Sequence, residues 1–212
     1  TPASRWTAAV EEGQRLARAA LIEQNLPGLS VAVGVQGDVV WAEGFGWSNL
    51  QTRTPMTPRT RVRIGHVSKA LTSVGVGLLR DEGRLHLDDE IQTMVPGFPE
   101  KAWPLTLRHL MANTAGVRHY DDDEWGDKPT TRCDRAAEGL ASFTGEPLLF
   151  EPGTEYRYST YGWVVVSAAV EARAGEPFFR FMARRVFEPL GMRDTTEDVV
   201  GVPTPDRSTS YY

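Results

Sequence analysis

The segment of residues 65–69 carries two side chains that could do chemistry together. Its sequence is Gly-His-Val-Ser-Lys, so that Lys69 follows His66 by three residues. Residues three apart lie on the same side of a helix, and the start of a helix together with apolar neighbours favours a neutral amine that accepts protons. Imidazole at position 66 can act as an acyl acceptor near neutral pH. The alternative role for Lys69 is that of a solvated lysine on a helix surface.

A second segment, residues 151–163, presents a tyrosine at the start of a helix. A Pro-Gly turn leads into Tyr158, Ser159 and Thr160, and Tyr158 lies 92 residues after His66. A tyrosine presented in this way can shuttle protons when a cation lies beside it. For a single tyrosine, the alternative is an ordinary core or surface aromatic residue.

One hairpin and several helices must position these side chains. Two apolar segments, 29–35 and 39–46, flank a turn that contains Gly37 and predict a β-hairpin. Residues 48–62 are rich in Thr, Pro and Arg and predict a loop. Apolar periodicity and helix-stop residues predict helices near residues 5–25, 66–81, 105–111, 161–174 and 177–190.

The predicted strands are too few for a stable sheet. Two strands alone are marginal in water, and the chain after residue 50 is mostly helical. We therefore divide the chain into an N-terminal helix with the first strands (1–62), a helical domain (63–198) and a tail (199–212) that offers at most one weak strand. The remaining strands are expected outside this chain.

The two segments together resemble the serine β-lactamase-like family, which includes class C β-lactamases, D-amino-acid peptidases and esterases. That family carries Ser-x-x-Lys first, then Tyr-x-Asn or a variant, then a Lys/His-Thr-Gly strand. Residues 118–120 and the Thr160 variant point to the subgroup of the mitochondrial serine β-lactamase-like protein and its bacterial relatives. Further phrases of the family occur at residues 27–33, 63–65, 82–85, 87–89, 109–116 and 187–192.

The resemblance implies a fold, a reaction and roles for residues. The fold is an α/β (α+β) sandwich of the β-lactamase/transpeptidase type, and the reaction is hydrolysis of a small ester, amide or β-lactam through an acyl-enzyme. Lys69 would be the general base or proton relay, and Tyr158 would activate the nucleophile and protonate the leaving group. Thr160 would bind the substrate or Lys69, and the backbone N–H of residue 66 would stabilise an oxyanion.

His66 departs from the family pattern, because the family has serine at this position. Three explanations stay open: an engineered substitution, a natural pseudoenzyme, or an imidazole that itself takes the acyl group. Ser68 is no replacement, since it lies about 200° around the helix from residue 66. The other histidines are assigned structural hydrogen bonds: His86, His109 and His119.

The third family motif does not occur after Tyr158. Its absence, together with the incomplete sheet, predicts that a C-terminal fragment or a second chain completes the fold. The alternative to an enzyme is a pseudoenzyme that binds a ligand or forms a scaffold or filament, and a homo-oligomer is also considered.

Composition limits the partners. The net charge of -5 and the pI of about 5.4 favour neither nucleic acid nor an anionic membrane. No apolar run is long enough to span a membrane. The acidic run at residues 121–124 could bind a metal, but we expect a solvated loop there and therefore neither a metal nor a cofactor. The single cysteine, Cys133, excludes an intrachain disulfide. The first residues lack an initiator methionine, as in a processed chain, so we expect an exported, periplasmic protein; a cytoplasmic or mitochondrial location stays open.

Overall fold

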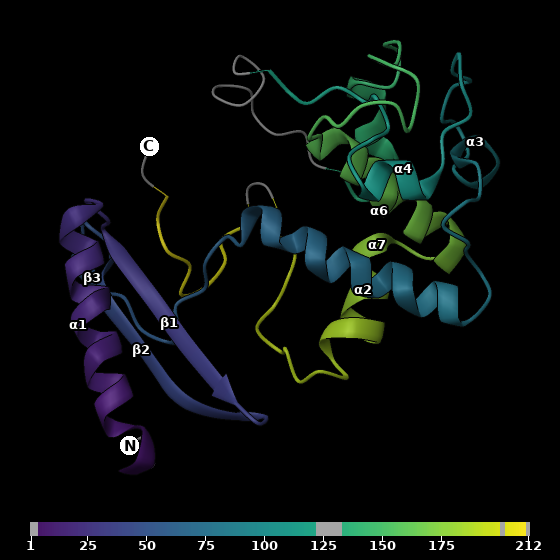
Figure 1. Cartoon of the computed structure of the whole chain (residues 1–212). Helices are drawn as coiled ribbons and strands as arrows, with labels where there is room; N and C mark the ends of the chain where they lie inside the picture. The colour runs from purple at the N-terminus through teal and green to yellow at the C-terminus, as the bar shows by residue number, and fades with distance from the viewer. Residues whose placement is uncertain (1–3, 122–132, 200–201, 211–212) are drawn as a thin grey trace. The chain divides into compact units, whose positions relative to one another are not determined.

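The computed structural model describes residues 4–121, 133–199 and 202–210, and the chain divides into two compact units (Figure 1). One unit contains residues 1–63 and 202–212, and it carries the sheet. The other contains residues 64–201 and is helical.

The sheet of the first unit has three antiparallel strands in the order β1-β2-β3. Strands β1 (Gly28–Val35) and β2 (Asp38–Asn49) form the hairpin predicted from the sequence, which is confirmed. The prediction of a loop over residues 48–62 is wrong at its start, because β2 continues to Asn49 and β3 (Thr54–Pro55) pairs with it. The polar residues close a tight turn here: Asn49 Oδ1 accepts the Thr52 N–H at 2.9 Å.

Helix α1 (Thr7–Glu23) packs on the hairpin. A side chain at Gly13 would meet the ring of Trp41 at 2.7 Å, so only glycine permits this close approach. Gln14 and Trp41 both donate hydrogen bonds to Glu43, at 2.7 and 2.9 Å. These bonds hold the pKa of Glu43 below its ordinary value and tie the helix to the middle of β2.

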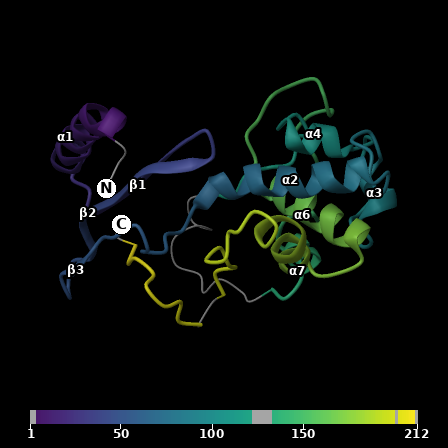
Figure 2. The same ribbon diagram turned by 90° about the horizontal axis from the view of Figure 1, so that it is seen from below.

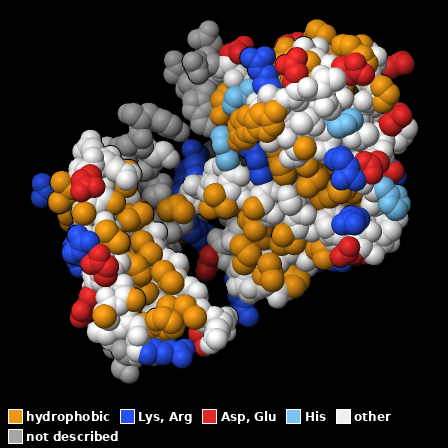
Figure 3. Space-filling model, viewed as in Figure 1, with side chains coloured by type: hydrophobic (Ala, Val, Ile, Leu, Met, Phe, Trp, Pro, Cys, Tyr) orange, Lys and Arg blue, Asp and Glu red, His pale blue; other side chains and the backbone are white. Residues whose placement is uncertain are grey.

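The tail adds little to the sheet. Its one described bridge joins Arg207 to Arg61 in parallel, and the N–H of Ser208 donates to the carbonyl of Arg61 at 2.9 Å. Val39 and Trp47 of β2 remain exposed, and Figure 3 shows hydrophobic side chains along this unit. The three strands therefore leave apolar surface that further structure could cover.

The second unit is built from short helices around two longer ones, α2 (Ser68–Asp81) and α6 (Thr160–Ala174), which contact each other (Figure 2). The predicted helices are confirmed, with two differences. The helix near residue 66 begins with a 3-10 turn, η2 (Gly65–Val67), and the segment 177–190 forms an α-helical turn followed by a π-helical one. The other elements are α3 (Ile91–Met94), α4 (Leu107–Met111), η3 (Ala136–Ser142), α7 (Phe178–Met182) and η4 (Ala183–Phe187).

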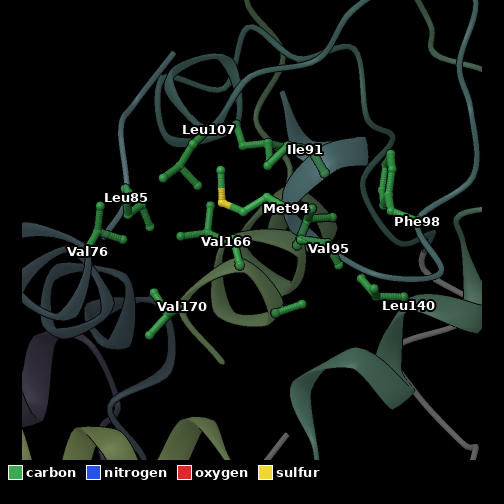
Figure 4. Packing of buried hydrophobic residues seen from close by; sticks show 14 of the residues in the cluster. Val76, Leu85, Ile91, Met94, Val95, Phe98, Leu107, Leu140, Val166 and Val170 are labelled. Atoms are coloured by element: carbon green, nitrogen blue, oxygen red, sulfur yellow. The ribbon is translucent and has the colours of Figure 1, made fainter. Parts of the chain in front are cut away.

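The core of the helical unit surrounds α6. This helix is buried on most sides, and Val166 and Val170 point among side chains from α2, α3 and α4 (Figure 4). Gly175 ends α6 in the left-handed conformation, at φ 71°, as its sequence predicts. The buried hydrophobic residues that form this core with α6 include Val76, Leu85, Ile91, Met94, Val95, Phe98, Leu107 and Leu140.

One charged side chain lies within this packing. Glu171 is 2% exposed, and its carboxylate accepts the backbone N–H groups of Ala136 and Phe178, both at 3.0 Å. It also pairs with Arg135 at 3.1 Å. The carboxylate thus satisfies N–H groups at the starts of η3 and α7 and connects both elements to α6.

We predict that Glu171→Ala lowers the free energy of unfolding by about 3 kcal/mol, because it removes a buried carboxylate that pairs with Arg135 and leaves the partly buried N–H groups of Ala136 and Phe178 without their acceptor. Chemical denaturation monitored by circular dichroism measures this difference. The exposed Glu100→Ala is the matched control and should change the stability by less than about 0.5 kcal/mol. Equal effects of the two substitutions would contradict the role of Glu171.

Candidate active site

Lys69 is directed toward the interior by its place on α2. The buried residues Thr72, Val76 and Leu79 follow it at helical spacing, so Lys69 continues the stripe that faces the core. Gly65 begins the preceding turn with a left-handed φ of 50°, and Ser68 Oγ donates to its carbonyl at 2.7 Å. This local structure places His66 on an exposed 3-10 turn just before α2.

Tyr158 and Thr160 are positioned by a polar cap at the start of α6. Ser159 is the N-cap residue: its buried hydroxyl accepts the Gly162 N–H at 2.9 Å and donates to the Arg118 carbonyl at 2.7 Å. Asn113 has a left-handed φ of 58°, and its side-chain oxygen accepts the Ser159 N–H at 3.2 Å. On the other side, the Arg157 N–H donates to the Asn113 carbonyl at 2.8 Å, so that the backbone is fixed both before and after Tyr158.

A chain of hydrogen bonds joins the two segments. The ammonium of Lys69 donates to Tyr158 Oη at 2.8 Å, and the same oxygen lies 2.8 Å from His66 Nδ1. Lys69 Nζ also lies 3.4 Å from Thr160 Oγ1 and 4.9 Å from the centre of the Tyr158 ring. All four residues predicted from the sequence are therefore brought together in the helical unit.

The donors and acceptors give this chain a direction. A lysine ammonium can only donate, so the Tyr158 oxygen accepts from Lys69. The phenol has one proton of its own, and it is directed to His66 Nδ1 when that nitrogen is unprotonated. The arrangement can therefore pass a proton between residue 66 and Lys69 through Tyr158. The catalytic roles of these residues stay predictions.

The sequence reasoning assigned only a structural hydrogen bond to His119, which lies at the same site. Its Nδ1 accepts the Thr160 N–H at 3.1 Å, and its ring is 5.4 Å from that of Tyr158. Burial lowers the pKa of His119 below its ordinary value, as do the nearby His66 and Lys69, while Asp121 opposes the shift. The sequence signal that could have indicated His119 was the motif Arg118-His119-Tyr120, but it was used only to assign the chain to a subgroup of the family.

Neither a metal site nor a membrane span accompanies this site. Across residues 4–121, 133–199 and 202–210, no group of three His, Cys, Asp or Glu side chains could hold a metal ion. In the same part of the chain, no helix is both long and apolar enough to cross a membrane.

Comparisons with known proteins place this geometry in a family. The mitochondrial serine beta-lactamase-like protein LACTB of Mus musculus is 28% identical over 271 residues, covering 93% of this chain and 49% of its own length. Penicillin-binding protein 4* of Bacillus subtilis is 26% identical over 162 residues, covering 75% of this chain and 35% of its own. The chain thus spans about half or less of the length of these relatives.

Solved structures agree with the sequence comparison. The octameric penicillin-binding protein homologue from Pyrococcus abyssi has a TM-score of 0.75 at 27% identity, covering 87% of this chain and 43% of its own. EstCE1, a hydrolase with promiscuous acyltransferase activity, has a TM-score of 0.76 at 27% identity, covering 89% and 53%. The predicted α/β fold of the β-lactamase/transpeptidase type is confirmed. The Beta-lactamase family model matches residues 10–212, and the chain belongs to the Beta-lactamase family.

Proposed function

We propose that this site performs acyl transfer of the serine-hydrolase type, with the acyl group attached at position 66 and protons relayed by Lys69 and Tyr158. The observation that carries the proposal is the hydrogen-bonded chain from Lys69 through Tyr158 to residue 66, with both distances at 2.8 Å. Membership of the Beta-lactamase family supports it. The substrate is a small ester, amide or β-lactam.

With serine at position 66, the steps follow from this geometry. The hydroxyl oxygen attacks the carbonyl carbon of the substrate, and its proton passes to the Tyr158 oxygen as Tyr158 gives its own proton to Lys69, which must be a neutral amine for this step. Tyr158 then delivers that proton to the departing nitrogen or oxygen as the acyl bond breaks. Water attacks the resulting ester by the same relay and releases the acid. Thr160, beside Lys69, holds the amine or the substrate.

His66 arrests this reaction in the present chain. Its Nδ1 occupies the hydrogen bond that Tyr158 would otherwise make with a serine hydroxyl. The relay is therefore complete but ends on an imidazole in place of the hydroxyl. We propose that two features limit activity here: the histidine at position 66 and the third motif that does not occur after Tyr158.

We further propose that a C-terminal portion or a second chain completes the sheet and supplies the third motif opposite position 66. This chain covers 49% of the mouse relative and 43% of the Pyrococcus homologue. Exposed Val39 and Trp47 on β2 support the same view. For the compartment, the mouse relative, named as mitochondrial, supports a mitochondrial location, and export to the periplasm of a bacterium stays our proposal from the sequence.

His66 also favours a second candidate function, a non-catalytic protein that binds a ligand or assembles as a scaffold or filament. Loss of the nucleophile would be neutral for such a role. The octameric homologue supports a homo-oligomer as its form. Native mass spectrometry and negative-stain electron microscopy test this candidate, and a monomer under all conditions would contradict the assembly.

The first prediction tests the nucleophile position. His66→Ser should create turnover of nitrocefin or p-nitrophenyl esters at least about 100-fold above the unchanged chain, because the relay then ends on a hydroxyl. Stopped-flow absorbance gives the rate, and intact-protein mass spectrometry detects the acyl adduct. The variant is measured in the 212-residue chain and in a chain extended along its parent gene to the length of the relatives.

His66→Ala is the matched control, since it frees Tyr158 without supplying a nucleophile, and it should stay at background. If the extended His66→Ser chain shows neither turnover nor an acyl adduct, the hydrolase proposal is wrong. A stable acyl adduct on His66 of the unchanged chain would contradict the proposal that His66 prevents acyl transfer.

The second prediction tests the relay. In the His66→Ser variant, Tyr158→Phe and Lys69→Ala should each lower kcat by about 100-fold to 10,000-fold, because each breaks the proton path. Thr160→Ala should lower kcat less, since the Thr160 hydroxyl lies 3.4 Å from Lys69 Nζ and outside that path. Steady-state kinetics with one ester measures all three. Full activity of Tyr158→Phe would show that protons travel by another route.

A further inference from the structure

His119 is a second imidazole beside the Tyr158 ring. The centre of the Tyr158 ring lies 5.6 Å from that of His66 and 5.4 Å from that of His119. The His119 and Tyr158 rings meet at 76°, an edge arrangement that aromatic pairs prefer. Tyr158 therefore has two imidazoles as neighbours, and of these two rings only that of His66 contacts its hydroxyl.

The hydrogen bond of His119 determines where its proton lies. Nδ1 accepts the Thr160 N–H at 3.1 Å, so this nitrogen is unprotonated and a neutral ring carries its proton on Nε2. A cationic ring has donors on both nitrogens and cannot make this bond. The contact with the first residue of α6 therefore requires a neutral His119.

The segment that carries His119 is itself held by α6. Ser159 Oγ donates to the carbonyl of Arg118 at 2.7 Å, and Arg118 Nη1 donates to the carbonyl of His119 at 3.0 Å. The ring also lies 3.8 Å from that of Tyr120. Backbone and side chain are thus fixed at two neighbouring residues, 159 and 160, just after the reactive tyrosine.

The charges around His119 favour its neutral form. The groups that face it are Lys69 and His66 from the start of α2, Asp121 from its own segment, and the phenols Tyr158 and Tyr120. Burial, then His66 and Lys69, lower its pKa, and Asp121 only partly opposes them. Since the neutral form makes the bond to Thr160, that bond is present at neutral pH and is lost as the pH falls through the lowered pKa.

We propose that His119 is a positioning residue: as a neutral ring protonated on Nε2, it fixes Thr160 and the Tyr158 ring, so that the Tyr158 oxygen stays within reach of both Lys69 and residue 66. The inference rests on the proposed relay. His119 acts on the relay through Tyr158, because in the described structure its ring makes no hydrogen bond to His66 or Lys69.

The first test needs no turnover and therefore stands even if the proposed hydrolase activity fails. Side-chain nitrogen NMR of the uniformly labelled 212-residue chain at pH 7.5 should show His119 neutral, with its proton on Nε2. On acidification, the Thr160 amide and Tyr158 ring signals should shift together, with a midpoint below the ordinary histidine value of 6.5. A proton on Nδ1 at pH 7.5, or Tyr158 signals that ignore the titration, would overturn the proposal.

The second test separates the hydrogen bond from the ring. His119→Asn keeps an acceptor for Thr160 without the ring, and His119→Phe keeps an aromatic ring without the acceptor. Both should abolish the acid shift of the Thr160 amide and alter the Tyr158 ring signals, whereas the exposed His86→Asn should do neither. If the Phe variant does not fold, the Asn variant decides.

In the His66→Ser variant, His119→Asn and His119→Phe should each lower kcat by about 10-fold to 100-fold and leave KM nearly unchanged, since a displaced tyrosine affects the chemical step. The acid limb of the kcat profile should also move. If thermal stability falls while kcat, its pH profile and the Tyr158 signals stay as before, His119 is structural only and the proposal is wrong.

Discussion

The hydrogen bond between Lys69 and Tyr158 is the contact that the arrangement of the site depends on. It joins residues 89 positions apart at 2.8 Å, which requires α2 and α6 to be placed with little freedom. Their buried faces supply that constraint, since a close-packed core transmits small displacements instead of absorbing them. Gly75 on α2 illustrates how tight this packing is, because a side chain there would meet the sulfur of Met182 at 2.9 Å.

Buried polar side chains then set the ends of the helices. Glu171 accepts from the starts of η3 and α7, and Ser159 caps α6 while holding the carbonyl of Arg118. Each satisfies backbone groups that apolar packing would leave unpaired. Asn113 and His119 extend this network to the residues beside Tyr158. The relay is therefore supported by hydrogen bonds that make no contact with the substrate position.

Position 66 carries a histidine whose imidazole fits into the hydrogen bonds around Tyr158. The imidazole takes up the hydrogen bond of Tyr158 at 2.8 Å, so the neighbouring polar groups stay satisfied. The Tyr158 oxygen therefore has a partner in His66 as well as in Lys69. The same observation makes fold and family poor guides to the activity of this particular chain.

The sequence by itself determined the hairpin and the helices, because apolar periodicity and turn residues are local signals. The meeting of Lys69 and Tyr158, 89 positions apart, was expected only from the family resemblance. It missed β3, whose two residues pair only because Asn49 and Ser48 close the turn before it. It also gave His119 no part in the site. Tertiary structure decided that part, since the bond to Thr160 and the contact with Tyr158 join segments about 40 residues apart whose approach no local pattern encodes.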